Sequence, residues 1–551
     1  MPSIQSKVFG GIRPAISDKA VQDVYATVAH NVCLETGTVQ PLREPKLLGT
    51  NQDKIRTLYK TKDSELCCSK FLTWDDCACV VPIQDPGCRG LNMYAVFYDL
   101  SCARDPEIYD PCTDEFCVLG ITPPFTALLA QEVTPGVSPT PDEVSYVYTW
   151  VDKFGIESQP SMPSNCLKKK DDAVVSLSNI SEPPMNACFM RVYRTTSPFL
   201  DGTQVKQGHG VSYQLIDEIE IDFNNLPTSF LDNYLLKDIL GGTLQTEEDC
   251  PPPKMCKVVD TEGGWLVGYK NNRIYVSDRN RPWSFPEVNT VELPDRILGI
   301  VPHYDSILVV TTGSPYTIAI TTSEDGTRVI PSPFGESIPA TKGDTLSSTP
   351  FGAVYVSERG LVALQPNGNI NIITAGRVQE KDWNQYRPDL GTYFRGKYYG
   401  FRTNGDGIII DIKDGVNDTT ILGDLVTHSV KADRVSCGYD GKLYIARDNQ
   451  YFLWGQGDNN LTYKWRSKLF GFGGIIKFNA AKVVGCFGDP VKLRLFKGCR
   501  KVAEKRVRDN RGFRLPPMGR DTDWMFEIEG NTEVCEVHIA TSLQELTEET
   551  R

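Results

Sequence analysis

Basic side chains gather in one short stretch near the end of the chain, and they are the strongest candidates for a binding role. Between residues 497 and 514, eight Lys and Arg side chains accompany only two acidic ones, Glu504 and Asp509. Cations at this density can contact the phosphates of DNA or an acidic neighbouring subunit, although a solvated loop between strands has the same composition. The candidate DNA or partner contacts are Lys497, Arg500, Lys501, Lys505, Arg506 and Arg508.

Patterns that would support catalysis are missing from the rest of the sequence. It contains no G-x-S-x-G elbow, no P-loop, no H-E-x-x-H motif and no cofactor fingerprint. Its five histidines, at positions 30, 209, 303, 428 and 538, have no Cys or Asp partner at a telling spacing. We therefore predict no catalytic residue, no metal ligand and no cofactor.

Glycoside hydrolysis is the one reaction that deserves a separate test, because it needs only two carboxylates on either side of a cleft. Four acids lie near the ends of expected strands, namely Asp278, Glu358, Asp382 and Asp440. With 70 Asp and Glu residues in the chain, acids near strand ends are unavoidable. We interpret these four as turn and surface residues.

Cysteines are concentrated in the first half of the chain. Thirteen of the 17 precede residue 260, and several cluster between Cys67 and Cys117. The spacings match no familiar zinc site, and His30 is the only early histidine. Free thiols, disulfides that form after the protein leaves the cytoplasm, and a metal knot all remain open.

Composition and charge limit the class of protein. The chain has 551 residues, of which 40% are hydrophobic, and a formal net charge of −12. An acidic surface argues against tight general binding of nucleic acid, but it permits DNA to pass without being gripped. Met1 to Gly11 contain no apolar signal core, and no run approaches the ~18 apolar residues of a membrane span. We expect synthesis in a reducing cytoplasm and no stable membrane insertion.

A repeated β unit between Gly263 and Phe470 must position any functional residue. Five short β-rich cores begin at residues 273, 306, 353, 397 and 442, in steps of 33, 47, 44 and 45 residues. Propeller blades repeat every 40 to 50 residues, and stacking the sheets around an axis buries faces that one sheet leaves exposed. We predict an all-β protein built on a β-propeller-like platform. The number of blades stays open: five units are visible, and a sixth could come from the N-terminal half.

The rest of the chain reads as an arm and smaller β modules. The only candidate helices are a brief one near Val21 to Val28 and one of about three turns at 229–240. Residues 497–514 are expected to be a basic loop between four C-terminal strands. The predicted regions are an extended N-terminal arm (1–62), a Cys-rich β segment (63–140), a fibronectin type III-like β-sandwich (141–253), the propeller-like blades (254–470) and a jelly-roll-like C-terminal β-sandwich (471–551).

Several loose motifs, in this order, resemble the tail nozzle proteins, also called tail tubular proteins, of short-tailed bacteriophages. No single motif is specific, and the Cys67 to Cys117 segment is not expected of that family. The segments that carry the resemblance are Phe9 to Pro14, Ala26 to Asn31, Glu35 to Pro41, Tyr146 to Ser161, Arg191 to Thr195, Trp265 to Pro286, Tyr355 to Leu361 and His538 to Leu546.

This resemblance implies a virion structural protein rather than an enzyme. It implies a hexameric ring of this chain in the phage tail, below the portal and adaptor, with viral double-stranded DNA in the lumen and fibres or a tip attached outside. Two alternatives remain. One is a propeller glycoside hydrolase or lyase that acts on host surface polysaccharide, and the other is a receptor-binding or fibre-attachment module.

Overall fold

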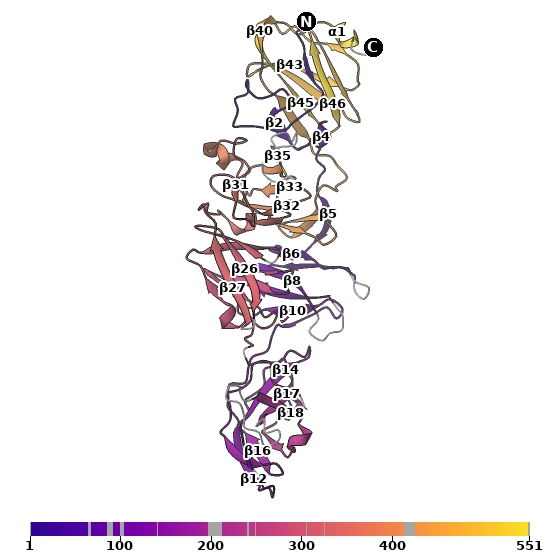
Figure 1. Ribbon diagram of the computed structural model, residues 1–551. Helices are drawn as coiled ribbons and strands as arrows, with labels where there is room; N and C mark the ends of the chain where they lie inside the picture. Colours follow the sequence, from indigo (N-terminus) through magenta and orange to yellow (C-terminus); the bar gives the residue numbers. More distant parts are fainter. Residues whose placement is uncertain are drawn as a thin grey trace.

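The computed structural model shows a long molecule with a propeller in the middle and a β-sandwich at each end (Figure 1). It describes residues 2–63, 68–84, 92–99, 104–139, 141–196, 212–239, 242–247, 249–304, 306–323, 326–412 and 425–548. Within these ranges 46 strands accompany four 3₁₀ helices and one α-helix of four residues, α1 (Glu545–Glu548). The predicted all-β class with a propeller-like platform is confirmed. No helix in the described ranges is long and apolar enough to cross a membrane.

The propeller contains seven sheets, two more than the five units visible in the sequence. Their inner strands contact one another in a closed ring, which defines the propeller axis. In ring order these strands are β6 (Thr57–Lys60), β8 (Ala78–Gln84), β20 (Cys256–Asp260), β24 (Ile297–His303), β28 (Ser347–Thr349), β32 (Leu390–Phe394) and β36 (Arg434–Cys437).

Most blades are antiparallel sheets of four strands, as the alternating sequence patterns require. The predicted cores fall on their second or third strands, which are β22 (Arg273–Val276), β25 (Ser306–Thr311), β29 (Gly352–Val356), β33 (Lys397–Phe401) and β37 (Leu443–Arg447). The other strands of these blades are β21 (Leu266–Lys270), β23 (Val291–Glu292), β26 (Tyr316–Ser323), β27 (Gly326–Pro333), β30 (Leu361–Leu364), β31 (Ile370–Ile372), β34 (Gly407–Asp411), β35 (Leu425–His428) and β38 (Gln450–Leu453).

The first two blades come from the end of the predicted N-terminal arm and from the region predicted as a separate Cys-rich segment. Strands β6 and β7 (Phe71–Trp74) form a two-stranded blade. A four-stranded blade follows, composed of β8, β9 (Asn92–Tyr98), β10 (Glu107–Asp110) and β11 (Glu115–Val118). The boundary predicted at residue 254 is therefore wrong. The propeller begins before the β-sandwich predicted at 141–253 and resumes after it.

The brief helix predicted in the N-terminal arm is also wrong. Within the described part of residues 1–62 there is no helix, and three of its six strands join sheets formed by distant parts of the chain. Strand β5 (Lys46–Thr50) pairs with β38 and completes the last blade, so the start of the chain closes the ring. Strand β2 (Ala26–His30) lies between β35 of the propeller and β39 (Tyr463–Ser467).

The C-terminal sandwich shares one sheet with the propeller. This ten-stranded sheet runs from β32 to β35 in a blade, through β2, and on to β39, β45 (Asp521–Gly530), β42 (Val491–Lys497) and β43 (Arg500–Val507). Strand β40 (Phe470–Ile476) also pairs with β45. The facing sheet has the order β1, β46, β41 and β44, with bounds Ile4–Ser6, Val534–Ala540, Ala480–Gly485 and Phe513–Arg514. The sandwich thus includes N-terminal strands that the predicted boundary at 471 excluded.

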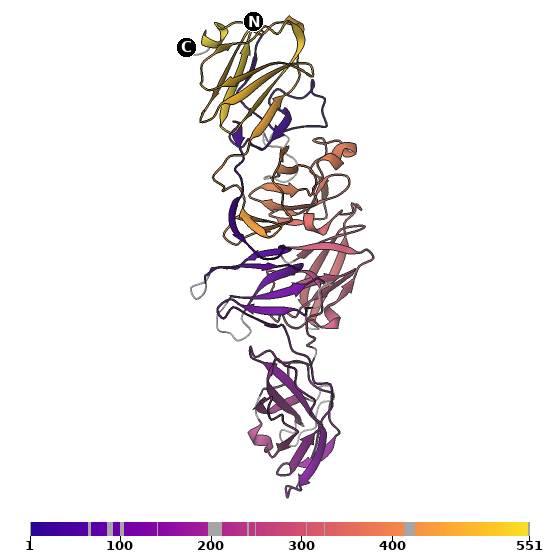
Figure 2. The ribbon, with the colours of Figure 1, turned by 180° about the vertical axis from the view of Figure 1, so that it is seen from behind.

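The remaining sandwich is inserted between β11 and β20, and it forms the end of the molecule opposite both termini (Figures 1 and 2). Its three sheets have the orders β12-β16-β19, β14-β17-β18 and β13-β15. The strands are β12 (Leu129–Thr134), β13 (Pro141–Val144), β14 (Tyr146–Asp152), β15 (Leu167–Lys170), β16 (Val174–Ser178), β17 (Ala187–Thr196), β18 (Ser212–Glu220) and β19 (Ser229–Asp232).

The helix predicted at 229–240 is wrong as well. Residues 229–232 form strand β19, followed by the single 3₁₀ turn η1 (Leu236–Asp238), and Leu240 lies outside the described residues. Phe230 and Asp232 point inward with a period of two, because Phe230 packs into the sandwich core while Asp232 meets a buried arginine. These tertiary contacts outweigh the helical spacing of the apolar residues.

Candidate functional site

Residues 497–507 of the basic stretch belong to a strand hairpin, not to the loop expected from the sequence, whereas residues 508–512 form no strand. Residues of β42 and β43 pair in antiparallel register from Val491 with Val507 to Lys497 with Arg500. Strand β43 lies at the edge of the ten-stranded sheet. The hairpin therefore holds its cations on a rigid edge of the C-terminal sandwich.

The six candidate contacts are not equivalent. Arg500, Lys505, Arg506 and Arg508 are exposed, and within the described chain none of them makes an ion pair. Lys501 pairs with Glu504 at 3.0 Å. Lys497 is partly buried, and its Nζ donates to the carbonyl oxygen of Arg520 at 3.2 Å and lies over the Trp524 ring. Four of the six are thus available to an external anion.

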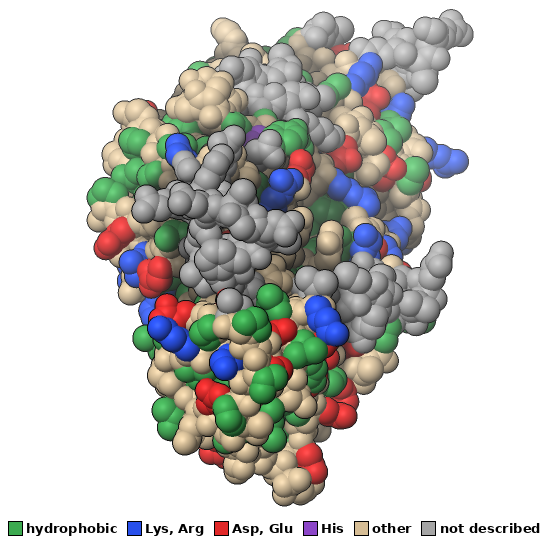
Figure 3. Space-filling model, turned by 60° about the horizontal axis from the view of Figure 1, so that its bottom comes forward, with side chains coloured by type: hydrophobic (Ala, Val, Ile, Leu, Met, Phe, Trp, Pro, Cys, Tyr) green, Lys and Arg blue, Asp and Glu red, His purple; other side chains and the backbone are tan. Residues whose placement is uncertain are grey.

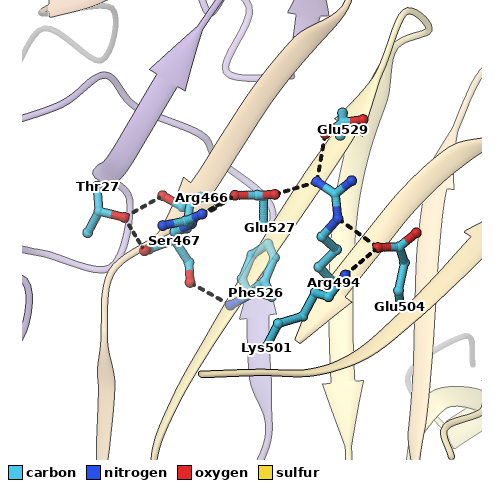
Figure 4. A network of polar contacts seen from close by, with 9 residues as sticks. All are labelled: Thr27, Arg466, Ser467, Arg494, Lys501, Glu504, Phe526, Glu527 and Glu529. Atoms are coloured by element: carbon cyan, nitrogen blue, oxygen red, sulfur yellow. Dashed lines mark hydrogen bonds and ion pairs between the residues drawn. The ribbon is translucent and has the colours of Figure 1, made fainter. Parts of the chain in front are cut away.

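Beside these cations runs a ladder of charges that the sequence did not reveal. Register places Arg494 of β42 between Glu504 of β43 and Glu527 of β45, and Arg466 of β39 on the far side of Glu527. Figure 4 shows Glu527 between the two guanidinium groups, with N–O distances of 2.6 Å to each. Glu527 is 2% exposed. The period-two spacing of Lys492 with Arg494, and of Glu527 with Glu529, is the only sequence signal for this ladder.

The ladder also shifts the titration of its carboxylates. A hydrogen bond from Arg494, at 2.6 Å, and another from Lys492, at 2.7 Å, lower the pKa of Glu529 to about 2. The same guanidinium lowers the pKa of Glu504. These lowered pKa values mean that folding stabilises the ionised form of both carboxylates.

We expect the charge ladder to make the free energy of unfolding fall at low pH. Because the folded pKa of Glu529 lies below its ordinary value of 4.5, its contribution is complete above pH ~5 and disappears as pH falls toward 2. Glu529→Gln should lower the free energy of unfolding by about 2 kcal/mol at pH 7, allowing for partial solvent screening. Urea unfolding at several pH values checks this, and a deficit that stays constant down to pH 2 would contradict it.

The four acids considered for glycoside hydrolysis do not form a carboxylate pair. Asp278 accepts hydrogen bonds from Ser284 and Asn289, and Asp440 accepts them from Lys60 and Tyr444. Glu358 is exposed, and Asp382 is partly exposed in the 3₁₀ helix η4 (Glu380–Gln385). No interaction between any two of the four is found in the described structure.

Histidines and cysteines likewise form no reactive group in the described ranges. His30 contacts Thr427 Oγ1 at 3.0 Å, while burial lowers the pKa of His428 to about 4; His209 lies outside the description. No cluster of three metal-binding side chains occurs there. Cys112 is disulfide-bonded, thirteen described cysteines are free thiols, and Cys67, Cys88 and Cys102 are not described. For Cys112, the disulfide alternative therefore holds.

The propeller axis carries charge of opposite sign at its two ends. Where the inner strands begin, a pocket of about 700 Å³ is lined by Lys257, Arg296 and Arg434. Where they end, a pocket of about 350 Å³ is lined by Asp260 and Glu262. The first pocket has the volume of a small-molecule site.

Comparisons with known proteins give the chain no family. No family model matches it, and no curated protein matches it. Among solved structures, the Pan2 WD40 domain of Neurospora crassa is 9% identical and has a TM-score of 0.26, covering 61% of this chain and 97% of that one. Virginiamycin B lyase from Staphylococcus aureus is 11% identical with a TM-score of 0.21, covering 59% and 98%. Similarity this low carries no argument about function.

Proposed function

We propose that this chain is a non-enzymatic structural protein of a short-tailed phage tail, a nozzle-like component that forms a ring, retains and guides the genome, and docks neighbouring tail proteins. One observation carries the proposal: a single sheet of ten strands runs from a propeller blade into the terminal sandwich through β2. Two modules joined by a continuous sheet resist relative motion. This suits a load-bearing part better than a hinged enzyme.

Two of the segments that carry the family resemblance, Phe9 to Pro14 and Ala26 to Asn31, lie at this joint. Phe9 packs edge-on against the Trp465 ring at a centroid distance of 4.9 Å, and the Ile12 amide donates to the Leu425 carbonyl at 2.8 Å. A Cβ on Gly11 would lie 2.5 Å from the Leu425 oxygen, so this glycine allows a close backbone approach. These residues of the Phe9 to Pro14 motif therefore have a structural role.

Any DNA channel would have to lie between copies of the chain. The propeller's own axis holds a pocket of about 700 Å³, and Asp344 bridges Lys257 and Arg434 at its mouth. Such a space accommodates a small molecule and not a duplex. The proposed lumen thus requires a ring of subunits, for which hexameric order is the expectation from the resemblance.

The sandwich inserted between β11 and β20 is the proposed docking module for the adaptor ring, fibres or tip. Large hydrophobic side chains are unusually exposed there, including Phe125, Leu129, Val133 and Leu231. Figure 3 views the molecule from this end, where hydrophobic side chains lie between charged ones. Exposed apolar surface with a polar surround is typical of protein–protein contacts.

The hairpin supplies a quantitative test of DNA contact. A plot of log affinity against log salt concentration has a negative slope. Each phosphate contact that is lost should make this slope less steep by about 0.9. The variant Arg500→Gln/Lys505→Gln/Arg506→Gln/Arg508→Gln should therefore reduce the slope by about 3 to 4 in filter binding of double-stranded DNA. A control variant, Lys237→Gln/Lys381→Gln, changes exposed cations on other modules. Equal slopes for the hairpin variant and the parent would rule out this contact.

Gold-labelled antibody on phage particles tests the proposed function itself. Electron microscopy should show label at the distal ring of the tail or between neck and fibres. Particles without label, together with soluble protein in the lysate, would overturn the structural role. Release of sugar from host envelope polysaccharide would then be measured next.

A further inference from the structure

The larger axial pocket brings together charged groups from strands that are not neighbours in the ring. Lys257 belongs to β20 and Arg434 to β36, while Asp344 belongs to the 3₁₀ turn η3 (Gly343–Thr345) just before β28. Asp344 lies 3.5 Å from Lys257 Nζ through one oxygen and 3.5 Å from an Arg434 nitrogen through the other. These two contacts link residues that line the pocket. Both are longer than a charge-assisted hydrogen bond of ~2.8 Å.

Cations outnumber carboxylates in this pocket. Arg56 and Arg296 line it together with Lys257 and Arg434, while Asp99 and Asp344 are its only acids in the described structure. Asp99 accepts a hydrogen bond from the Cys256 thiol at 3.4 Å. Asp344 is the only carboxylate of the pocket that contacts Lys257 and Arg434, and its side chain is 52% exposed. An external anion can thus reach the same cations.

The backbone places Lys257 in this position by an unusual conformation. The pairing of β20 with β21 shifts register between Cys256 and Val259, and Lys257 adopts a φ of 36° in the left-handed region. A non-glycine residue in that region is strained, and such bulges often redirect a side chain at a binding site. Its Nζ donates to the Gly343 carbonyl at 2.6 Å, which leaves the ammonium's remaining hydrogens for the pocket.

The walls of the pocket supply an apolar surface beside these charges. Ala78, Val80 and Val435 line it with partly exposed side chains, and the Tyr269 hydroxyl is occupied by a hydrogen bond to the Leu298 carbonyl at 2.7 Å. Pockets with mostly apolar walls and a few convergent polar groups are typical of small-molecule sites. A ligand here would have an anionic end and an uncharged body.

We propose that the axial pocket binds a small organic anion, a phosphate ester or carboxylate, between Lys257 and Arg434, where its charged group displaces Asp344. In the unliganded protein Asp344 stands in for that group and lowers the apparent affinity. This site is independent of the proposed tail function.

Calorimetric titration with inorganic phosphate and with citrate, each against sodium chloride of equal ionic strength, tests the proposal. Binding should be saturable with one site per chain. Lys257→Gln and Arg434→Gln should weaken it at least tenfold, as the loss of a charge-assisted hydrogen bond implies. If phosphate binds more tightly, the natural ligand is a phosphate ester; if citrate binds more tightly, it is a carboxylate.

Asp344→Asn provides the decisive arm, because it should tighten binding about three- to tenfold. A gain in affinity cannot arise from misfolding, whereas weakened binding can. The matched controls are Lys381→Gln and Glu358→Gln, exposed on the same propeller and remote from the pocket lining. Absence of saturable binding, or an Asp344→Asn affinity equal to or below that of the parent, would overturn the proposal.

Discussion

A chain that lacks residues 2–50 is expected to lose the folded propeller and the C-terminal sandwich together. The deletion removes β5, which closes the last blade, and β2, which lies inside the ten-stranded sheet. The side chains that it removes include five apolar ones that are at most 4% exposed, namely Phe9, Ile12, Val32, Leu34 and Val39. At ~2 kcal/mol each, their burial contributes about 10 kcal/mol, which is comparable to the whole stability of a typical domain.

The deletion can be tested by expression and by reconstitution. The 51–551 fragment should be insoluble or lack a cooperative thermal transition, and adding a 2–50 peptide during refolding should restore both. Deletion of residues 2 and 3 alone, which precede β1, is the matched control and should leave the transition unchanged. A monomeric 51–551 fragment that unfolds at the parent's temperature would show that the N-terminal strands are dispensable.

The repeat in the sequence predicted the propeller because its information is local. Each of the five cores combines alternating burial with a turn, and each falls on one strand of a blade. The first two blades escaped detection because the inserted sandwich separates them from the others. The closing strand β5 escaped because its pairing with β38 joins residues about 400 positions apart. A pattern within a short window cannot report such a pairing.

The same limit explains the two helices that were wrongly predicted. Val21, Val24 and Val28 have helical spacing, but Ala26–His30 forms a strand because β35 and β39 offer it backbone partners on both sides. In the inserted sandwich, Phe230 packs into the hydrophobic core as part of a strand, although the local spacing of apolar residues is helical. Short apolar segments do not determine their own secondary structure when a sheet edge is available.

The candidate site was predictable in composition but not in geometry. The excess of Lys and Arg between 497 and 514 is visible in the sequence, and the structure places four of these cations, without ion pairs in the described chain, at a sheet edge. Their contact with DNA or a partner stays a prediction. The ladder through Arg494 and Glu527 depends on strand register, which the sequence does not specify. The axial pocket depends on the closure of all seven blades.

Asp232→Ala is expected to unfold the inserted sandwich preferentially, at a cost of about 3 to 5 kcal/mol. The Asp232 side chain is fully buried, and one carboxylate oxygen accepts hydrogen bonds from Arg194 at 2.6 Å and from the Tyr146 hydroxyl at 2.7 Å. Arg194 is 3% exposed. Without Asp232, the buried guanidinium charge of Arg194 would have no counter-charge from this carboxylate. It would also lie near a second buried cation, Lys169, and burial already lowers the pKa of that lysine.

Hydrogen exchange resolved by strand locates the effect of this change. Amides of β14, β17 and β19 should exchange at least a hundredfold faster in Asp232→Ala, while those of the propeller should not change, because Asp232 joins β19 to β14 and β17 within the insert. The double variant Arg194→Met/Asp232→Leu should recover part of the loss, since an apolar pair of similar size removes both buried charges. Glu115→Gln, which breaks an exposed ion pair with Lys153, should cost at most ~0.5 kcal/mol. Equal exchange in Asp232→Ala and Glu115→Gln would mean that the buried charge of Arg194 is compensated elsewhere in the sandwich.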